Sequence, residues 1–203
     1  MGSNLVNLDR VVFTGGPSGG KSTALAHVPS MCSLYDTAPE TATMLLSGGF
    51  PAPSETHPWT YAWQRSFQKA IAAGQVALEE VCALRAVDGG QYGILHDRGL
   101  PDGAAYLRGG MDELAELTNN EPAAMIGRYD LVIHLVSSAK QPRGYQKHTN
   151  QHRFEEASEA IRLDDKILEA WCDHPNRVII DIEDRRERNS AVLEQVCSPR
   201  TQT

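Results

Sequence analysis

The sequence of 203 residues has few of the features that mark secreted, membrane-spanning or disordered chains. Its four cysteines, Cys32, Cys82, Cys172 and Cys197, form no Cys-x-x-Cys pair, so we expect neither a disulfide framework nor a zinc site. The longest apolar runs, such as Leu131–Ile133, are far shorter than the roughly 20 residues of a membrane span. The first residues lack the basic start and apolar core of a signal peptide. We therefore expect a cytoplasmic protein with no membrane partner.

Positive charge is also scarce, with 19 Lys and Arg against 26 Asp and Glu, which gives a net charge of -7. This balance argues mildly against sequence-independent binding of nucleic acid, although a local cleft can still be basic. With 41% hydrophobic and 22% charged residues, the composition excludes a disordered, collagen-like or coiled-coil chain. A chain of this length buries roughly 70% of its unfolded surface, so we expect one domain over residues 1–203.

Short apolar segments alternate with helical patterns along the chain. Because parallel neighbouring strands need long crossover connections, this alternation predicts an α/β fold with a parallel sheet. The predicted strands are Arg10–Thr14, Gly93–His96, Asp130–Val136, Arg177–Ile182 and, more weakly, Met31–Tyr35. The predicted helices are Lys21–His27, Glu40–Leu46, Thr60–Val87, Asp102–Leu117 and Phe154–Cys172. A further short helical segment is predicted after Asn189.

The segment after the first predicted strand matches the pattern G-x-x-x-x-G-K-[ST] and leads into a helix. Glycines let successive backbone N–H groups point at phosphate oxygens, and the helix adds its positive N-terminal end. We expect Lys21 to reach the β and γ phosphates, Ser22 to bind Mg²⁺ and Thr23 to reach the α phosphate. The nucleotide-binding segment is Gly15, Gly16, Pro17, Ser18, Gly19, Gly20, Lys21, Ser22 and Thr23.

Asp97 and Arg98 directly follow the strand predicted over Gly93–His96. Ligands of open α/β sheets bind at the carboxyl ends of the strands, so Asp97 is predicted to hold Mg²⁺ directly or through water. Arg98 would then face a phosphate or the acceptor. The alternative interpretation is a surface ion pair that ends the strand.

Glu40 follows the weaker strand and begins a predicted helix. If that strand belongs to the sheet, Glu40 lies over the acceptor side of the cleft, where a general base could take a proton from a hydroxyl. Alternatively, Glu40 is an acidic residue that favours the positive end of its own helix. The two roles are compatible.

The segment Ser137–Gln151, after the fourth strand, is rich in basic and polar residues. Cations in and just after this segment could close over the triphosphate and stabilise charge on the transferred phosphoryl group. The candidates are Arg143 and Arg153, followed by Lys147. A solvated basic loop is the alternative.

Aromatic and carboxamide side chains cluster at spacings of three to four residues around the start of the long helix. Such a set suits a stacked base whose edge is read by hydrogen bonds, although plain core packing is the more common explanation for any single aromatic. The candidates for substrate binding are Trp63, Phe67 and Gln68, with Trp59 and Gln64 beside them.

Four pieces of the sequence resemble the small AAA-domain P-loop proteins that group with the nucleoside and nucleotide kinases rather than with ring-forming ATPases. These pieces are Val12–Thr23, Pro39–Thr43, Asp97–Tyr106 and Arg128–Leu135. The resemblance implies a three-layer fold with a five-stranded parallel sheet, a helical lid over about residues 137–156, and ATP and Mg²⁺ as cofactors.

The Asp97-Arg98 element is similar to that of deoxynucleoside and thymidylate kinases. This similarity implies that Arg98 lies near the acceptor and that Glu40 acts as the base, while Asp97 remains a second candidate for that role. Phage P-loop kinases similar to thymidylate kinase phosphorylate 5-hydroxymethyluracil within DNA, and a flipped base would suit the aromatic cluster. In that case the protein would work in the cytoplasm of the bacterial host.

Two functions therefore follow from the sequence. The first is a kinase that transfers the γ-phosphoryl group of ATP to a nucleoside, a nucleotide or a hydroxymethyl base in DNA. The second is an ATPase that couples hydrolysis to a partner protein. A GTPase is disfavoured because the chain has no Asn-Lys-x-Asp element. The sequence leaves the monomer and the homodimer open.

Overall fold

A computed structural model of the chain describes residues 8–141 and 157–198. Five parallel strands form one sheet in the order β2-β3-β1-β4-β5. This confirms the predicted α/β class and the five-stranded parallel sheet. The strands are β1 (Asp9–Thr14), β2 (Tyr35–Ala38), β3 (Gly93–Asp97), β4 (Leu131–Leu135) and β5 (Arg177–Ile180).

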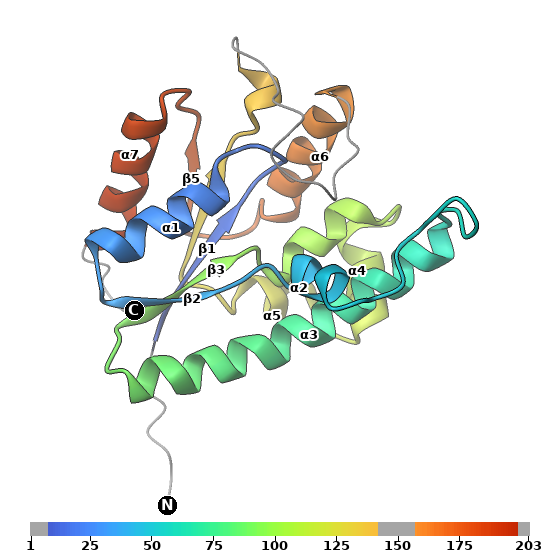
Figure 1. Cartoon of the computed structure of the whole chain (residues 1–203), viewed down its shortest axis with the longest axis horizontal. Coiled ribbons are helices and arrows are strands. Elements are labelled where there is room, and N and C mark those ends of the chain that lie inside the picture. The colour runs from blue at the N-terminus through green and yellow to red at the C-terminus, as the bar shows by residue number, and fades with distance from the viewer. Residues whose placement is uncertain (1–7, 142–156, 199–203) are drawn as a thin grey trace, which may run out of the picture.

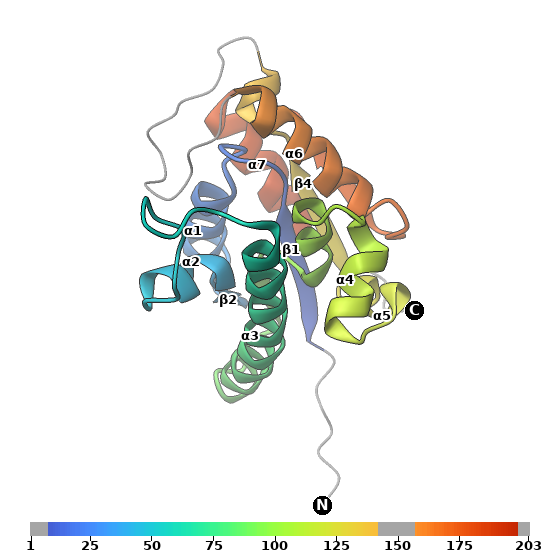
Figure 2. The same cartoon turned by 90° about the vertical axis from the view of Figure 1, so that its right-hand side faces the viewer.

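Helices cover both faces of the sheet (Figure 1). The helices α1 and α7 pack together on one face, whereas α3 contacts β2 and β3 from the other face, where α6 also lies. Figure 2 shows α2 and α4 on either side of α3. The helices are α1 (Lys21–Met31), α2 (Thr41–Ser47), α3 (Tyr61–Asp88), α4 (Gly110–Thr118), α5 (Pro122–Ile126), α6 (Ala157–Ala170) and α7 (Arg185–Cys197), with 3₁₀ turns η1 (Leu100–Tyr106) and η2 (Ser138–Lys140).

The strand β1 shows why the sheet is buried on both sides. Successive side chains of a strand point to opposite faces, so Val11 and Phe13 pack on the side of α1 and α7, and Val12 packs on the side of α6. All three side chains are fully buried. A continuous apolar run is therefore what this central strand requires.

Two predicted elements differ from the structure. The weak strand predicted at Met31–Tyr35 is wrong by four residues, because Met31 ends α1 and β2 begins only at Tyr35. The helix predicted over Asp102–Leu117 is interrupted: η1 ends at Tyr106, and α4 begins at Gly110, whose φ of 59° breaks the helical path. The other predicted helices are confirmed within a few residues, and α3 runs without interruption for 28 residues.

No helix in the described part of the chain is long and apolar enough to cross a membrane.

Candidate active site

The predicted phosphate loop connects β1 to α1 at the carboxyl edge of the sheet. It takes left-handed backbone conformations at Gly15 (φ 120°), Ser18 (φ 59°) and Gly20 (φ 92°). Gly20 is the N-cap of α1 and has no side chain with which to cap it. The start of α1 therefore lacks a side-chain cap, as an anion-binding helix terminus requires.

Lys21 lies over this loop. Its Nζ donates hydrogen bonds to the carbonyl oxygens of Gly15 (2.8 Å) and Gly16 (2.7 Å), and the residue is only 7% exposed. Ser22 and Thr23, in the first turn of α1, are exposed to solvent. The ammonium group and the two hydroxyl-bearing residues thus stand at the same end of α1, as the sequence pattern requires.

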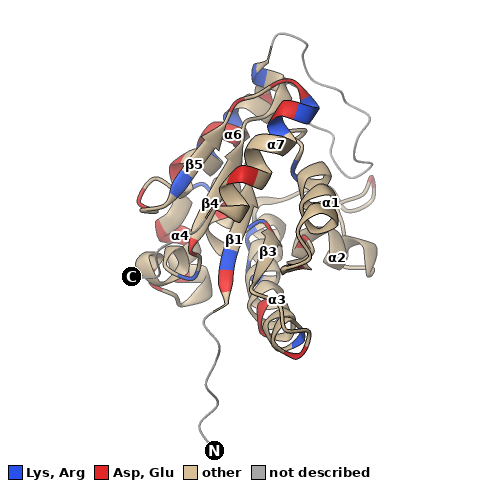
Figure 3. Cartoon of the chain, turned by 90° about the vertical axis from the view of Figure 1, so that its left-hand side faces the viewer, with Lys and Arg blue, Asp and Glu red and all other residues tan. Residues whose placement is uncertain are grey.

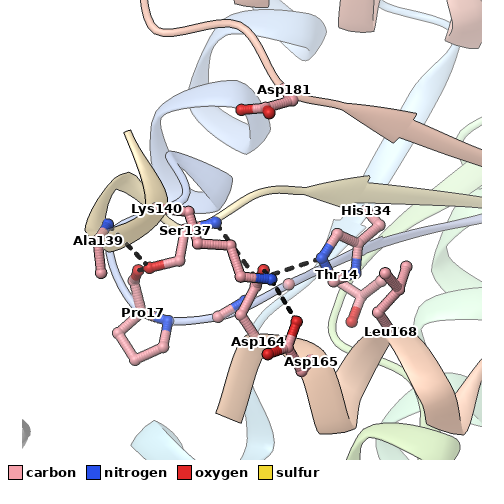
Figure 4. A network of polar contacts seen from close by, with 12 residues as sticks. Thr14, Pro17, His134, Ser137, Ala139, Lys140, Asp164, Asp165, Leu168 and Asp181 are labelled. Carbon is pink, nitrogen blue, oxygen red and sulfur yellow. Dashed lines mark hydrogen bonds and ion pairs between the residues drawn. The ribbon is translucent and has the colours of Figure 1, made fainter. Parts of the chain in front are cut away.

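A buried carboxylate from α6 holds the outer side of the loop (Figure 4). Asp164 accepts a hydrogen bond of 2.6 Å from the Gly16 N–H and one of 3.2 Å from His134 Nε2, and it forms an ion pair of 2.7 Å with Lys140. Burial by itself would raise the pKa of Asp164, but the bonds from His134 and Lys140 hold it well below its usual range. The carboxylate is therefore ionised at neutral pH, and it fixes the loop to β4 and α6.

Asp164 was not predicted as a site residue from the sequence. The residue lies 148 positions from Gly16 along the chain, inside an ordinary amphipathic helix, so no local pattern marks it.

Asp97 and Arg98 end the strand next to β1. Asp97 is the last residue of β3 and is in register with Phe13. Arg98 adopts a left-handed conformation (φ 75°), which is rare for a residue other than glycine. Its N–H donates to Phe13 O (3.1 Å), and its carbonyl accepts from Gln75 (2.9 Å), so the surrounding structure holds the strained residue in place.

The guanidinium of Arg98 connects three parts of the site. Its Nε donates to Glu40 Oε1 at 2.6 Å, and its Nη1 lies 3.4 Å both from Gly15 O and from Asp102 Oδ1. Its Nη2 is buried and has no hydrogen-bond partner among the described residues. Burial opposes the charge, but the acidic groups around it, Tyr106 and Glu40 foremost, raise the pKa of Arg98 well above its usual value. Arg98 is therefore a permanent cation between Glu40 and the phosphate loop.

Glu40 is the N-cap residue of α2, but its side chain does not cap that helix. Its other carboxylate oxygen accepts a hydrogen bond of 2.5 Å from the Thr43 hydroxyl. The carboxylate thus faces Arg98 rather than the N–H groups of its own helix, which favours the interpretation as a site residue over that of a helix-end charge.

A cavity of about 710 Å³ opens beside this pair, between α2, α3 and η1. The predicted aromatic residues Trp59, Trp63 and Phe67 line it, and Trp63 stacks on Phe67 with ring centroids 4.8 Å apart. Phe50, which is not a lining residue, packs on Phe67 with ring centroids 5.2 Å apart. Gln68, only 4% exposed, also lines it. Packing and binding are therefore not alternatives here, because the rings pack on one another and still form a wall of the cavity.

The described part of the cavity wall carries few charges. Among the described residues that line it, the charged ones are Glu40, Arg98 and Asp102, two acidic groups against one basic group. Asp102 is buried and binds the Thr14 hydroxyl and the Gly99 N–H (2.8 Å). Asp102 was not predicted as a site residue, although its position four residues after Arg98 is a signal in the sequence that could have indicated it.

Three predicted cations, Arg143, Lys147 and Arg153, lie outside the described residues. Of the predicted lid over residues 137–156, the structure describes residues 137–141, which include η2. Lys140 in η2 contacts Asp164 and Asp165 (2.7 Å each), so the start of this segment is held against α6 beside the phosphate loop.

The residues present fit a magnesium ion bound together with a nucleotide. Among the described residues, no group of three or more His, Cys, Asp or Glu side chains could hold a metal by itself. Mg²⁺ in nucleotide sites needs only one or two protein oxygens, because phosphates and water supply the rest. Ser22, at the start of α1, and Asp97, at the end of β3, are the residues predicted to supply these oxygens.

Comparison with known proteins agrees with the geometry. Residues 10–188 match the family described as AAA domain, and this match includes the phosphate loop, Glu40 and the Asp97-Arg98 element. No curated protein sequence matches the chain. Because the family covers most of the chain and the loop geometry is that of a phosphate site, the protein belongs to this AAA-domain family of P-loop NTPase type.

Proposed function

We propose that the protein is an ATP-dependent kinase that transfers the γ-phosphoryl group to a hydroxyl of an uncharged, flat acceptor. The observation that carries this proposal is the position of Arg98, which contacts both the phosphate loop at Gly15 and Glu40 on the cavity wall. A nucleotide on the loop and an acceptor in the cavity would therefore meet at one guanidinium. A kinase needs this meeting of two ligands, whereas an enzyme that only hydrolyses ATP needs no second organic cavity.

On the nucleotide side, Lys21 and the N–H groups at the start of α1 would hold the phosphates. Ser22 and Asp97 would hold Mg²⁺, which when bound neutralises phosphate charge. Arg98, with its buried and unpartnered Nη2, could donate to an oxygen of the transferred group. Phosphoryl transfer depends mostly on such positioning and charge stabilisation.

On the acceptor side, we assign the base to Glu40. Glu40 lines the cavity, whereas Asp97 does not, so Glu40 is the carboxylate within reach of an acceptor hydroxyl. It would accept the hydroxyl hydrogen bond and orient the oxygen toward the nucleotide. Arg98 keeps the carboxylate in this orientation through the bond to Oε1.

The charge of the cavity favours an acceptor without a phosphate of its own. The described wall carries two carboxylates and one arginine that is already paired, so a nucleoside monophosphate would meet net repulsion. The stacked Trp63 and Phe67 and the buried Gln68 suit a base with polar edges. A nucleoside meets these demands, and so does a flipped 5-hydroxymethyluracil base in DNA.

The cations predicted at Arg143, Lys147 and Arg153 would add charge stabilisation from the lid segment. An ATPase that couples hydrolysis to a partner protein is the second candidate, because membership of an AAA-domain family is compatible with it.

The test is transfer of labelled phosphate from ATP in the presence of Mg²⁺. The acceptor panel contains nucleosides, nucleoside monophosphates, plain DNA and DNA with 5-hydroxymethyluracil. We expect label on a nucleoside or on the modified DNA, and none on monophosphates. Label that appears only as free phosphate with every acceptor would overturn the kinase proposal and favour the ATPase.

Lys21→Ala should abolish transfer and leave the fold intact, because the Lys21 ammonium binds loop carbonyls rather than the core. Lys69→Ala is the matched control, since Lys69 is an exposed lysine on α3. Near-normal turnover of Lys21→Ala would show that the loop is not the nucleotide site. Circular dichroism and thermal melting verify that both variants fold.

A further inference from the structure

We propose that Arg188, on the C-terminal helix α7, is a ligand of the nucleotide phosphates. This inference rests on the proposed function, because it assumes that the loop binds a nucleotide. No part of the sequence pattern points to α7, which follows β5 and lies far from the loop in the sequence. The inference comes from the contact between α7 and the start of α1.

The guanidinium of Arg188 lies directly against Gly20. A Cβ built on Gly20 would be 2.7 Å from Arg188 Nη2 and 2.8 Å from both its Cζ and its Nε. The absence of a side chain at Gly20 thus lets the guanidinium cover the backbone one residue before Lys21. Because α1 and α7 pack side by side (Figure 1), this contact lies where the two helices meet.

Arg188 has few partners at this position. Its Nη1 lies 3.5 Å from Ile182 O, its Nε is buried without a hydrogen-bond partner, and no described carboxylate forms an ion pair with it. The facing helix α1 offers no counter-charge, since it contains no Asp or Glu (Figure 3). Burial lowers the pKa of Arg188, although the nearby Asp184 carboxylate acts in the opposite direction.

A half-buried cation at this place is unfavourable by itself. The N-terminus of a helix carries partial positive charge, which repels a guanidinium, and the buried Nε lacks an acceptor. Both costs are removed if an anion lies between the guanidinium and the start of α1. The loop that leads into α1 is the proposed phosphate site, so the anion with the right position is a phosphate of the bound nucleotide.

An arginine suits this role because its planar N–H groups can bind two phosphate oxygens at once. The packing of the guanidinium on the backbone of Gly20 favours a phosphate contact over a contact with the base, since backbone N–H groups of this loop face phosphates. The C-terminal helix would therefore complete the nucleotide site from the face of the sheet opposite to α3 and α6.

The experiment measures binding of adenosine, AMP, ADP and ATP by calorimetry to the full chain and to three variants. Arg188→Met removes the charge, Arg188→Lys keeps the charge without the planar fork, and Arg186→Met is the control, an exposed arginine on the same helix. A charged hydrogen bond is worth about 1.5 to 3 kcal/mol, so Arg188→Met should lower the affinity for AMP, ADP and ATP about 10- to 150-fold. Adenosine should bind unchanged.

Arg188→Lys should weaken the same ligands less than Arg188→Met does, and Arg186→Met should match the wild type. Unchanged affinity of Arg188→Met for ADP and ATP would overturn the inference while the proposed function stands. An equal loss for adenosine would also overturn it, because that result assigns Arg188 to the base or to folding. If Arg188→Met does not fold, Arg188→Lys takes its place. Unchanged affinity of Arg188→Lys for ADP and ATP, or an equal loss for adenosine, would then overturn the inference. Failure of the wild type to bind any nucleotide would instead overturn the proposed function.

Discussion

At the scale of single residues, Arg98 has an unusual combination of properties. It takes a left-handed backbone conformation, it is 7% exposed, and its side chain reaches both Glu40 and the loop carbonyl of Gly15. The backbone conformation costs about 1 to 3 kcal/mol, and burial of the cation is unfavourable unless it is paired, as it is here with Glu40. Such unfavourable features are found mainly at functional sites, where a side chain must be held in one position. Here that position lies between the acceptor cavity and the phosphate loop.

Glu40→Gln should reduce phosphoryl transfer about 10²-fold or more, because the amide cannot take a proton from the acceptor hydroxyl. Nucleotide binding should remain, since Glu40 has no part in the loop. The measurement is turnover and ATP affinity of the variant, with Glu116→Gln on the exposed side of α4 as control. An unchanged rate would contradict the role as base and support the alternative, in which the Glu40 charge stabilises the start of α2.

At the scale of elements, the phosphate loop takes its shape from neighbours that are distant in the sequence. Gly16 donates to Asp164 of α6, and the Ser137 hydroxyl donates to Pro17 O at 2.6 Å. A Cβ on Gly15 would overlap the carbonyl oxygen of Leu135 at the end of β4. The loop is therefore enclosed by β4 and α6 on the side away from the acceptor cavity.

Gly15→Ala should destabilise the protein by several kcal/mol and weaken nucleotide binding. Its φ of 120° is unfavourable for alanine, and the new methyl group would strike the backbone of β4. Gly90→Ala is the matched control: its φ is 65°, but nothing lies within 4 Å of the new methyl group, so we expect a cost of about 1 kcal/mol and normal binding. Urea denaturation and ADP titration give the two quantities. Equal effects of both substitutions would contradict the close packing of Gly15 on β4.

At the scale of the whole molecule, a buried polar cluster joins α3 to the sheet on the side opposite to α1. Glu79, 1% exposed, accepts hydrogen bonds from Arg128 (2.6 Å) and Tyr129 (2.7 Å). His96 lies 4.0 Å from the same carboxylate and is 1% exposed, and neither of its ring nitrogens has a hydrogen-bond partner among the described residues. Burial lowers the pKa of His96 from 6.5 to about 4, although Glu79 acts in the opposite direction.

The low pKa of the buried His96 predicts that the protein loses stability as the pH falls from about 6.5 to 4. In that range the unfolded chain binds a proton at His96 while the folded chain does not, so the free energy of unfolding falls as the pH falls. A pKa lowered from 6.5 to about 4 corresponds to a loss of roughly 3 kcal/mol.

Urea denaturation at pH 7 and pH 4.5 measures this difference. His96→Gln should remove most of it, and His57→Gln, which changes an exposed loop histidine, should leave it unchanged. A His96→Gln variant with the full pH dependence of the wild type would contradict this assignment.

Local pattern was sufficient for some elements and not for others. The strands β1, β3, β4 and β5 and the phosphate loop were predictable because each depends on a short run of residue types. The position of β2 was not, because its pairing with β3 and not its own composition selects Tyr35–Ala38. The interruption at Gly110 was hidden for a similar reason, since the apolar residues on either side keep a helical spacing.

The sequence by itself determined the α/β class and the identity of the phosphate loop, because these depend on periodicity and on residues that are adjacent along the chain. It also indicated Glu40, Arg98, Trp63, Phe67 and Gln68 as candidate site residues, but not which of them contact one another. Only the tertiary structure placed Glu40 on Arg98, 58 residues away, formed the cavity beside them, and brought Asp164 and Arg188 to the loop. The physical reason is that contacts between elements depend on the packing of the sheet and its helices, which no local spacing encodes.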